Sequence, residues 1–328
     1  MPQAIITGVA GYLPDYVLTN AELETMVDTN DQWIRERTGI RERRIQKGEG
    51  LGTSDLAVPA VRELLERTGT APGEVELVVC CTVTGDYRFP DTGTLIAHKA
   101  GLANAYGYDL AAACSGFLYG LHAGAQYVMA GTHKKVIVVG ADKMSSIIDY
   151  ADRNTCILFG DGAAAVMLEP SDDAALGVRE TCLFGDGAGG LDLYTLGGGS
   201  VHPATVATVE AGMHNMVQNG RVVFKNAVRG MSGAVAQVLA KAGLDASEVD
   251  WVVPHQANIR IIESVAKQLD FPMERVMVTI ERYGNTTAAT IPLCLRDYAP
   301  RLAPGDELVL TAFGGGYTWG AMRLTWAV

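Results

Sequence analysis

Cys114 lies in the stretch "DLAAACSGFLYGL", residues 109–121, between a run of alanines and a Ser-Gly step. The residues before it can form a strand, and "SGFLYGLHAGAQYVMAG" after it is typical of a buried helix. Small neighbours permit a sharp turn and a close approach of substrate. A thiol at a helix N-terminus also lies at the positive end of the helix dipole, which favours the thiolate. Two interpretations stay open from these residues: a catalytic nucleophile or a small buried hydrophobe.

Two polar residues in the last third of the chain belong to the same chemistry. His255 follows a buried strand pattern in "WVVPHQANIRIIESVAKQL", and Asn285 lies in "ERYGNTTAATIPL". A satisfied core histidine and a helix N-cap asparagine are the structural alternatives. The triple glycine in "FGGGYTWG", residues 313–320, lets backbone N–H groups face a site, as an oxyanion hole requires. It is not a phosphate loop, because no Lys-Ser/Thr pair follows it.

An internal repeat indicates the elements that must position these residues. Residues 60–79 and 234–253 align without gaps at an offset of 174, with eight identical positions. Each copy predicts a helix, a glycine turn, a short acidic loop and a buried strand. "HKKVIVVGAD" (133–142) and "GDELVLTAFG" (305–314) form a second, weaker pair. We therefore expect two duplicated α/β halves, residues 1–170 and 171–328, with residues 171–220 as connection and loops.

The repeat also predicts where His255 lies. The first-half strand ends in "VVCCTVTGD", and its second-half counterpart ends in "VVPHQAN". His255 should therefore stand at the carboxyl end of a buried strand, where α/β sheets commonly bind ligands.

Composition limits the function classes. The 328 residues are 48% hydrophobic and 19% charged, which predicts a globular protein with a sizeable core. A formal net charge of -11 argues against nucleic acid as the main partner. The six cysteines contain no CxxC pair and several lie in apolar runs, which indicates reduced, buried thiols and a cytoplasmic setting. No signal peptide and no membrane span are predicted, because the start lacks a basic segment and no apolar run reaches about 18 residues.

Taken together, the motifs resemble the β-ketoacyl-acyl-carrier-protein synthase III family of the thiolase-like superfamily. The resemblance runs from end to end through "TNDQWIRERTGIRERRI", "AACSGFLYGL", "FGDGAAAVML", "HQANIRII", "ERYGNTTAATIP" and "FGGGYTWG". It implies an α/β, thiolase-like five-layered αβαβα fold made of two similar halves. It also implies that Cys114 is the nucleophile, that His255 and Asn285 form the activating pair, and that the N–H groups of Cys114 and Gly315 form the oxyanion hole.

The chemistry implied by the resemblance has two stages. Cys114 attacks a short acyl-CoA, CoA leaves, and an acyl-enzyme remains. Malonyl-acyl carrier protein then loses CO2, and His255 and Asn285 stabilise the enolate that attacks the acyl group. The product is a 3-oxoacyl-acyl carrier protein, and neither a metal nor a cofactor is expected, since acyl-CoA is a substrate.

Binding residues are also implied by the resemblance. Trp33 is expected to stack on the CoA adenine with Arg153 on its other face, assisted by Arg37 and Thr38. Asn258 and Phe224 are expected along the pantetheine tunnel. Phe89 is expected to cross a homodimer interface and close the partner's acyl pocket, with simple interface packing as the alternative. An acidic carrier protein is expected to dock on four basic residues: Lys225, Arg229, Arg260 and Lys267.

Other functions stay open beside this one. A synthase-III-like condensing enzyme of secondary metabolism has the same motifs, and a Cys-His-Asn set also serves thioester hydrolases. A thiolase is disfavoured, because the late glycine run "AFGGG" lacks a second cysteine. The sequence does not determine which acyl primer is used.

Overall fold

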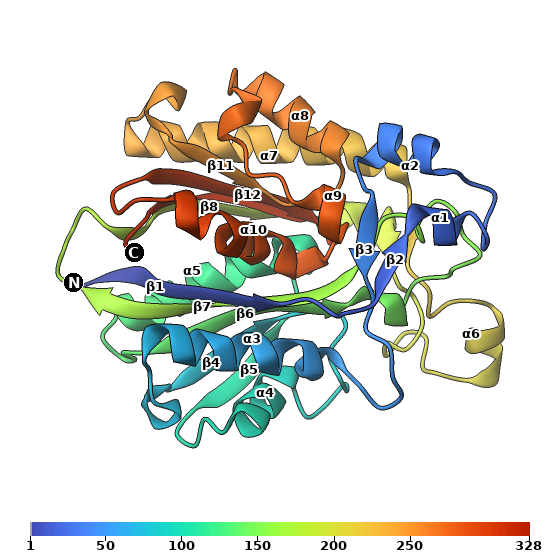
Figure 1. Ribbon diagram of the computed structural model, residues 1–328, viewed down its shortest axis with the longest axis horizontal. Helices are drawn as coiled ribbons and strands as arrows, with labels where there is room; N and C mark the ends of the chain where they lie inside the picture. Colours follow the sequence, from blue (N-terminus) through green and yellow to red (C-terminus); the bar gives the residue numbers. More distant parts are fainter. Residues whose placement is uncertain (1) are drawn as a thin grey trace.

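Two β-sheets form the centre of the structure, a computed structural model that describes residues 2–328 (Figure 1). The first sheet contains β1 (Gln3–Tyr12), β4 (Leu77–Cys81), β5 (Tyr106–Leu110), β6 (Val136–Lys143) and β7 (Asp161–Ser171). Their order in space is β1-β7-β6-β4-β5. β7 runs antiparallel to β1 and β6, whereas β4 runs parallel to β5 and β6.

The second sheet repeats this pattern with one strand fewer. It contains β8 (Gly177–Gly185), β11 (Trp251–Pro254), β12 (Glu307–Gly314) and β13 (Thr318–Thr325). The order is β11-β12-β13-β8, with β11 parallel to β12 and the other two pairs antiparallel. The strands β8, β13, β12 and β11 thus correspond in order and direction to β1, β7, β6 and β4.

Helices cover and separate the sheets in five layers (Figure 1). α3 (Thr53–Thr68) and α4 (Thr92–Ala100) pack on the outer face of the first sheet, and α7 (Gly220–Ala242) packs on the outer face of the second. α8 (Ile259–Gln268) lies against α7. α5 (Gly116–Met129) and α10 (Thr290–Tyr298) lie between the sheets. The predicted α/β thiolase-like fold of two duplicated halves is confirmed.

The sequence repeat folds into equivalent elements in both halves. α3 leads to β4 and α7 leads to β11, and each helix ends at a glycine in the left-handed region, Gly69 (φ 63°) or Gly243 (φ 68°). The C-terminal turns also match, since Thr70 N–H donates to Leu65 at 3.0 Å and Leu244 N–H donates to Leu239 at 3.1 Å. Glycine suits both positions because a side chain disfavours this conformation.

Smaller elements flank the two sheets near the site. In the first half these are β2 (Val17–Thr19), α1 (Asn20–Leu23), α2 (Asp31–Thr38) and β3 (Glu42–Arg44). In the second they are β9 (Leu193–Tyr194), α6 (Val206–Glu210), β10 (Val217–Gln218) and α9 (Ile280–Tyr283).

The prediction that residues 171–220 are connection and loops is wrong for one segment. β8 spans nine residues and pairs antiparallel with β13 at the edge of the second sheet. Only part of it is buried, so it lacks the continuous apolar run by which the central strands were recognised.

All six cysteines are buried and none forms a disulfide, as their placement in apolar runs predicted. Among residues 2–328, no helix combines the length and the hydropathy that crossing a membrane requires.

Candidate active site

A cavity of about 500 Å³ brings residues of both halves together. Cys114, His255 and Asn285, far apart in the sequence, all line it. Three further residues predicted for the site line the same cavity: Phe224, Asn258 and Gly315. Its walls are mainly apolar with a few polar groups, as is typical of small-molecule sites.

Cys114 lies at the turn that starts α5. A 3₁₀ turn over Ala113–Ser115 precedes the helix, and Ala113 adopts φ 46°, a left-handed value that is uncommon outside glycine. The turn packs closely against the second half, because a Cβ on Gly314 would lie 2.7 Å from the Cys114 backbone N. Such strained turns concentrate at functional sites.

The Cys114 thiol differs from the expectation of a favoured thiolate. The side chain is only 7% exposed, and burial raises the pKa of the thiol to about 12, with the Asp142 carboxylate adding to the shift. Its own backbone N–H acts in the opposite direction but is the weaker influence. Burial is the largest of these influences on the pKa, so the thiol is neutral and would need a base to take its proton if it acted as a nucleophile.

His255 is the residue directly after β11, as the repeat predicted. Its backbone N–H donates to Thr311 at 2.8 Å, which continues the parallel ladder to β12. Its Nδ1 lies 2.7 Å from Thr290 Oγ1, at the first residue of α10. Burial lowers the pKa of the imidazole to about 3, so the ring is neutral at physiological pH.

Asn285 is held on both sides by backbone hydrogen bonds. Its N–H donates to Leu158 at 2.8 Å, and its carbonyl accepts from Gly160 N–H at 3.0 Å. Its side-chain Oδ1 accepts from Thr287 N–H at 2.9 Å. Because the amide oxygen is engaged there, the NH2 group is the end that is available to a ligand in the cavity.

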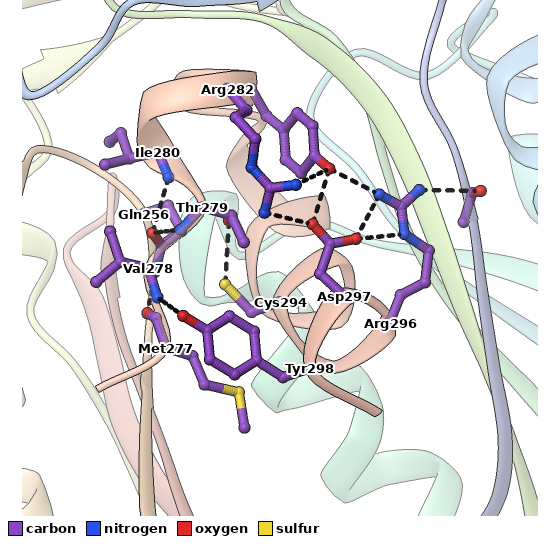
Figure 2. Close-up of polar contacts among 12 residues, drawn as sticks. Gln256, Met277, Val278, Thr279, Ile280, Arg282, Cys294, Arg296, Asp297 and Tyr298 are labelled. Carbon is purple, nitrogen blue, oxygen red and sulfur yellow. Dashed lines mark hydrogen bonds and ion pairs between the residues drawn. The ribbon is translucent and has the colours of Figure 1, made fainter. Parts of the chain in front are cut away.

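Gln256, which the sequence interpretation did not single out, braces the segment that leads to α9. Its Oε1 accepts from the N–H groups of Thr279 (2.9 Å) and Ile280 (3.1 Å), and its Nε2 donates to Pro254 (2.8 Å) and Met277 (3.1 Å). Figure 2 shows this segment beside α10. The sequence feature that could have drawn attention to Gln256 is its position directly after His255.

An ion-paired cluster joins α9 to α10 in the same view (Figure 2). Asp297 Oδ2 accepts from Tyr283 Oη at 2.7 Å and pairs with Arg282 at 2.8 Å, while Arg296 pairs with Asp297 Oδ1 at 2.6 Å. This cluster holds the two helices on either side of the loop that carries Asn285.

Asp142 is a second residue that sequence reasoning missed. This fully buried carboxylate accepts from the N–H groups of Val83 (2.9 Å) and Thr84 (3.2 Å), and from Ala288 N–H at 3.2 Å. Burial raises the pKa of Asp142 to about 6, although these hydrogen bonds oppose the shift. It lies at the end of "VIVVGAD", one of the segments of the second repeat pair.

The residues predicted to contact a nucleotide lie outside the cavity lining. The guanidinium carbons of Arg37 and Arg153 lie 5.1 and 4.7 Å from the centre of the Trp33 ring. Arg153 also pairs with the exposed Asp28 at 3.3 Å. Thr38 is 2% exposed, and its hydroxyl donates to Ile34 O at 2.7 Å and accepts from Ile40 N–H at 3.0 Å. Its contact with a nucleotide stays a prediction.

The remaining predicted binding residues occupy distinct surfaces. Phe89 is 87% exposed and does not line the cavity of its own chain. Asn258 caps α8, where its Oδ1 accepts from Arg260 N–H at 2.9 Å. The four basic residues predicted for carrier docking are exposed on two neighbouring helices: Lys225 and Arg229 on α7, Arg260 and Lys267 on α8.

The side chains that commonly bind metal ions are not grouped together among the described residues. Within residues 2–328, no group of three or more His, Cys, Asp or Glu side chains is placed to hold an ion.

The chain is similar to one family throughout its length. A model described as 3-oxoacyl-[acyl-carrier-protein (ACP)] synthase III matches residues 108–181, and one for the C-terminal part of these proteins matches residues 239–326. A relative from Bacteroides thetaiotaomicron, β-ketoacyl-[acyl-carrier-protein] synthase III 1, is 51% identical over 323 residues, covering 98% of this chain and 96% of the relative.

Solved structures agree with the sequence comparison. The 3-oxoacyl-[acyl-carrier-protein] synthase III from Aquifex aeolicus superposes with a TM-score of 0.90 at 40% identity, covering 98% of this chain and all of that one. The priming β-ketosynthase of the R1128 polyketide biosynthetic pathway superposes with a TM-score of 0.91 at 33% identity, covering 100% of this chain and 98% of that one.

Proposed function

The chain belongs to the 3-oxoacyl-[acyl-carrier-protein] synthase III family, and we propose that it performs this family's condensation with the residues of the shared cavity. It is an acyltransferase, an initiating condensing enzyme of fatty acid synthesis. The observation that carries the assignment of roles is the convergence of Cys114, His255 and Asn285 on one cavity.

The first half-reaction loads an acyl group onto the enzyme. Cys114 Sγ attacks the carbonyl carbon of a short acyl-CoA while His255 Nε2 takes the thiol proton, as the neutral state of both groups requires. The N–H groups of Cys114 and Gly315 hold the oxyanion. The carbon–sulfur bond to CoA breaks, the CoA sulfur receives the proton from His255, and acyl-Cys114 remains.

The second half-reaction forms the carbon–carbon bond. Malonyl-acyl carrier protein binds, its carboxylate leaves as CO2, and the electron pair of the broken bond forms an enolate. His255 Nε2–H and the Asn285 amide NH2 donate hydrogen bonds to the enolate oxygen. The enolate carbon attacks the acyl carbonyl, the Cys114 sulfur leaves as a thiolate that takes up a proton from solvent, and 3-oxoacyl-acyl carrier protein is released. The chemistry of these residues requires neither a metal nor an organic cofactor.

Substrates and partners follow from the same proposal. Trp33, Arg37 and Arg153 bind the CoA nucleotide, and Phe224 and Asn258 contact the pantetheine arm. The exposed basic residues on α7 and α8 attract an acidic carrier protein. Two copies form a homodimer in the cytoplasm, in which the exposed Phe89 closes the partner's acyl pocket. Residues 1–170 supply the nucleophile, and residues 171–328 supply the His/Asn pair.

Two alternatives make different predictions. The comparisons do not favour an enzyme of secondary metabolism, because the curated relatives of about 50% identity are named β-ketoacyl-[acyl-carrier-protein] synthase III. A thioester hydrolase would require water at the acyl-enzyme, whereas Cys114 and His255 are 7% and 1% exposed.

The test is to incubate the protein with a panel of labelled straight and branched acyl-CoAs and to locate the label by mass spectrometry. We expect a stable acyl group on Cys114, absent in Cys114→Ser, that is discharged with CO2 release when malonyl-acyl carrier protein is added. Accumulation of free acid would indicate a hydrolase, and transfer only to another acceptor would indicate secondary metabolism. The most efficient acyl-CoA would identify the primer.

A further inference from the structure

We propose that Thr290 is a positioning residue that supports both tautomers of His255, so that one ring can serve both half-reactions. This inference rests on the proposed function. Thr290 does not itself line the cavity; it acts through the 2.7 Å contact between its Oγ1 and Nδ1 of His255, which does.

The two half-reactions need opposite states of the same nitrogen. Attack by Cys114 needs a bare Nε2 that accepts a proton, whereas enolate stabilisation needs Nε2–H as a donor. In a neutral imidazole the other nitrogen must hold the complementary state. His255 Nδ1 must therefore be a donor in one half-reaction and an acceptor in the other.

The Thr290 hydroxyl has two arrangements that meet this need. Its Oγ1 lies 3.1 Å from Thr287 O and 2.7 Å from His255 Nδ1. When the hydroxyl donates to Thr287 O, its oxygen accepts from Nδ1–H and Nε2 is bare. The other state forms when the ring exchanges its proton with water between the departure of CoA and the binding of the carrier protein, so that Nδ1 loses a proton and Nε2 gains one. The hydroxyl then rotates and donates to the bare Nδ1.

Neither arrangement leaves a buried polar group unpaired. Thr287 O also accepts from the backbone N–H of Thr290, so it keeps a partner when the hydroxyl rotates away. Because an unsatisfied buried group costs roughly 1–3 kcal/mol, pairing in both arrangements keeps the two tautomers close in energy. Thr290 is itself 2% exposed, so bulk water does not replace the hydroxyl as the partner of Nδ1.

The equivalent position in the first half indicates that the fold alone does not require the Thr290 hydroxyl. At the repeat offset of 174, Cys81 corresponds to His255 and Gly116 corresponds to Thr290. A Cβ on Gly116 would lie 3.3 Å from Cys81 Cβ, so these positions are neighbours there too. At the position equivalent to Thr290 the first half has no side chain, so a hydroxyl at this position accompanies the histidine.

The test separates the half-reactions in Thr290→Val, Thr290→Ser and a matched control, Thr279→Val. Thr279 is 1% exposed and its hydroxyl contacts Cys294 Sγ at 3.2 Å, so the control also removes a buried hydroxyl but leaves His255 untouched. Cys114 acylation is followed from acyl-CoA alone, and decarboxylation from malonyl-acyl carrier protein alone. Both are measured across pH.

We expect Thr290→Val to slow the half-reactions unequally, with at least one falling roughly 10- to 100-fold, because valine pairs with neither state of Nδ1. Thr290→Ser should stay within about threefold of the parent, since a hydroxyl is retained. Equal loss in both half-reactions, or a loss no greater than that of Thr279→Val, would overturn the proposal.

A spectroscopic measurement covers the case in which Thr290→Val does not fold. Nitrogen-15 NMR of the histidines, with His255→Gln to assign the signals, reports the protonation of each ring nitrogen in the parent and in Thr290→Ser. We expect the His255 tautomer to differ between the resting enzyme and the acyl-enzyme. One unchanged tautomer in both would refute the proposal, whereas failure of the parent to acylate Cys114 would instead refute the proposed function.

Discussion

The two halves of the molecule start their central helices with the same turn and use it differently. In the first half, Ala113 at φ 46° precedes Cys114; in the second, Thr287 at φ 52° precedes Ala288. The third residue after Ala113 begins α5, and the third residue after Thr287 begins α10. Both helices lie between the sheets. The backbone conformation is present in both copies, whereas the cysteine, the proposed nucleophile, is present in only one.

The backbone N–H groups of the two turns also differ. β6 pairs Val136 with Leu77 of β4, and β12 pairs Leu308 with Trp251 of β11. Six residues further along each strand stand Asp142 and Gly314, which are therefore equivalent. Asp142 accepts the N–H of Ala288, whereas Gly314 has no side chain to reach the N–H of Cys114.

This difference teaches how a duplicated fold becomes one active site rather than two. In the second half a carboxylate occupies the place where a substrate oxygen would be held. In the first half a glycine leaves that place open, and His255 of the other half lines the same cavity as Cys114. Four predictions test this comparison.

The largest effect is expected when the thiol is moved from one turn to the other. Cys114→Ala should lower condensation by roughly 10⁴-fold or more, as for other removed nucleophiles. Adding Ala288→Cys should not restore it, because the Ala288 N–H is already bonded to Asp142. Mass spectrometry of the acylated protein checks both variants, and an acyl group on residue 288 would contradict the comparison.

Gly314→Ala should give the next largest loss. A methyl group at this position would lie 2.7 Å from the Cys114 N and displace the turn or cover its N–H. Loss of one oxyanion donor lowers turnover about 10²- to 10³-fold. Acylation kinetics test this, with Gly233→Ala as control, since a Cβ there meets no atom within 4 Å. Equal rates for the two variants would show that Gly314 does not keep the N–H open.

Asp142→Asn should change how stability depends on pH. Burial raises the pKa of Asp142 in the folded protein to about 6, above its unfolded value, so its contribution is largest below about pH 4 and is lost as pH rises through 6. A shift of this size corresponds to at most about 3 kcal/mol between those limits. Urea unfolding of the parent and of Asp142→Asn from pH 4 to 8 measures the difference. Parallel curves would mean that Asp142 does not titrate in this range.

The smallest effect concerns two arginine–tryptophan contacts, one in each half. Arg153 lies 4.7 Å from the Trp33 ring centre and Arg301 lies 4.8 Å from that of Trp251. Arg153→Ala should raise KM for acyl-CoA about three- to tenfold with little change in kcat, as for lost uniform binding. Arg301→Ala is the control of matched geometry. Equal KM values for both variants would show that Arg153 does not contribute to the binding of acyl-CoA.

Much of the site was predictable from local sequence. Cys114 was recognisable from its small neighbours, and His255 from its place after a strand that repeats at an offset of 174. Strand β8 was not recognised, because an edge strand buries too few residues to give a continuous apolar run. Gln256 and Asp142 were missed because three of the four Gln256 partners are 21 to 24 residues away and the Asp142 partners are 58 to 146 residues away.

The sequence by itself determined the repeated helix–strand units, the duplication and the types of the candidate reacting groups, since these depend on local periodicity and side-chain chemistry. Only the tertiary structure decided their protonation and pairing. Burial keeps both the Cys114 thiol and the His255 ring neutral, against the local expectation of a thiolate. The N–H of Ala288 is occupied only because the two halves pack face to face, and the Thr290 contact exists because α10 packs beside β11 within the second half.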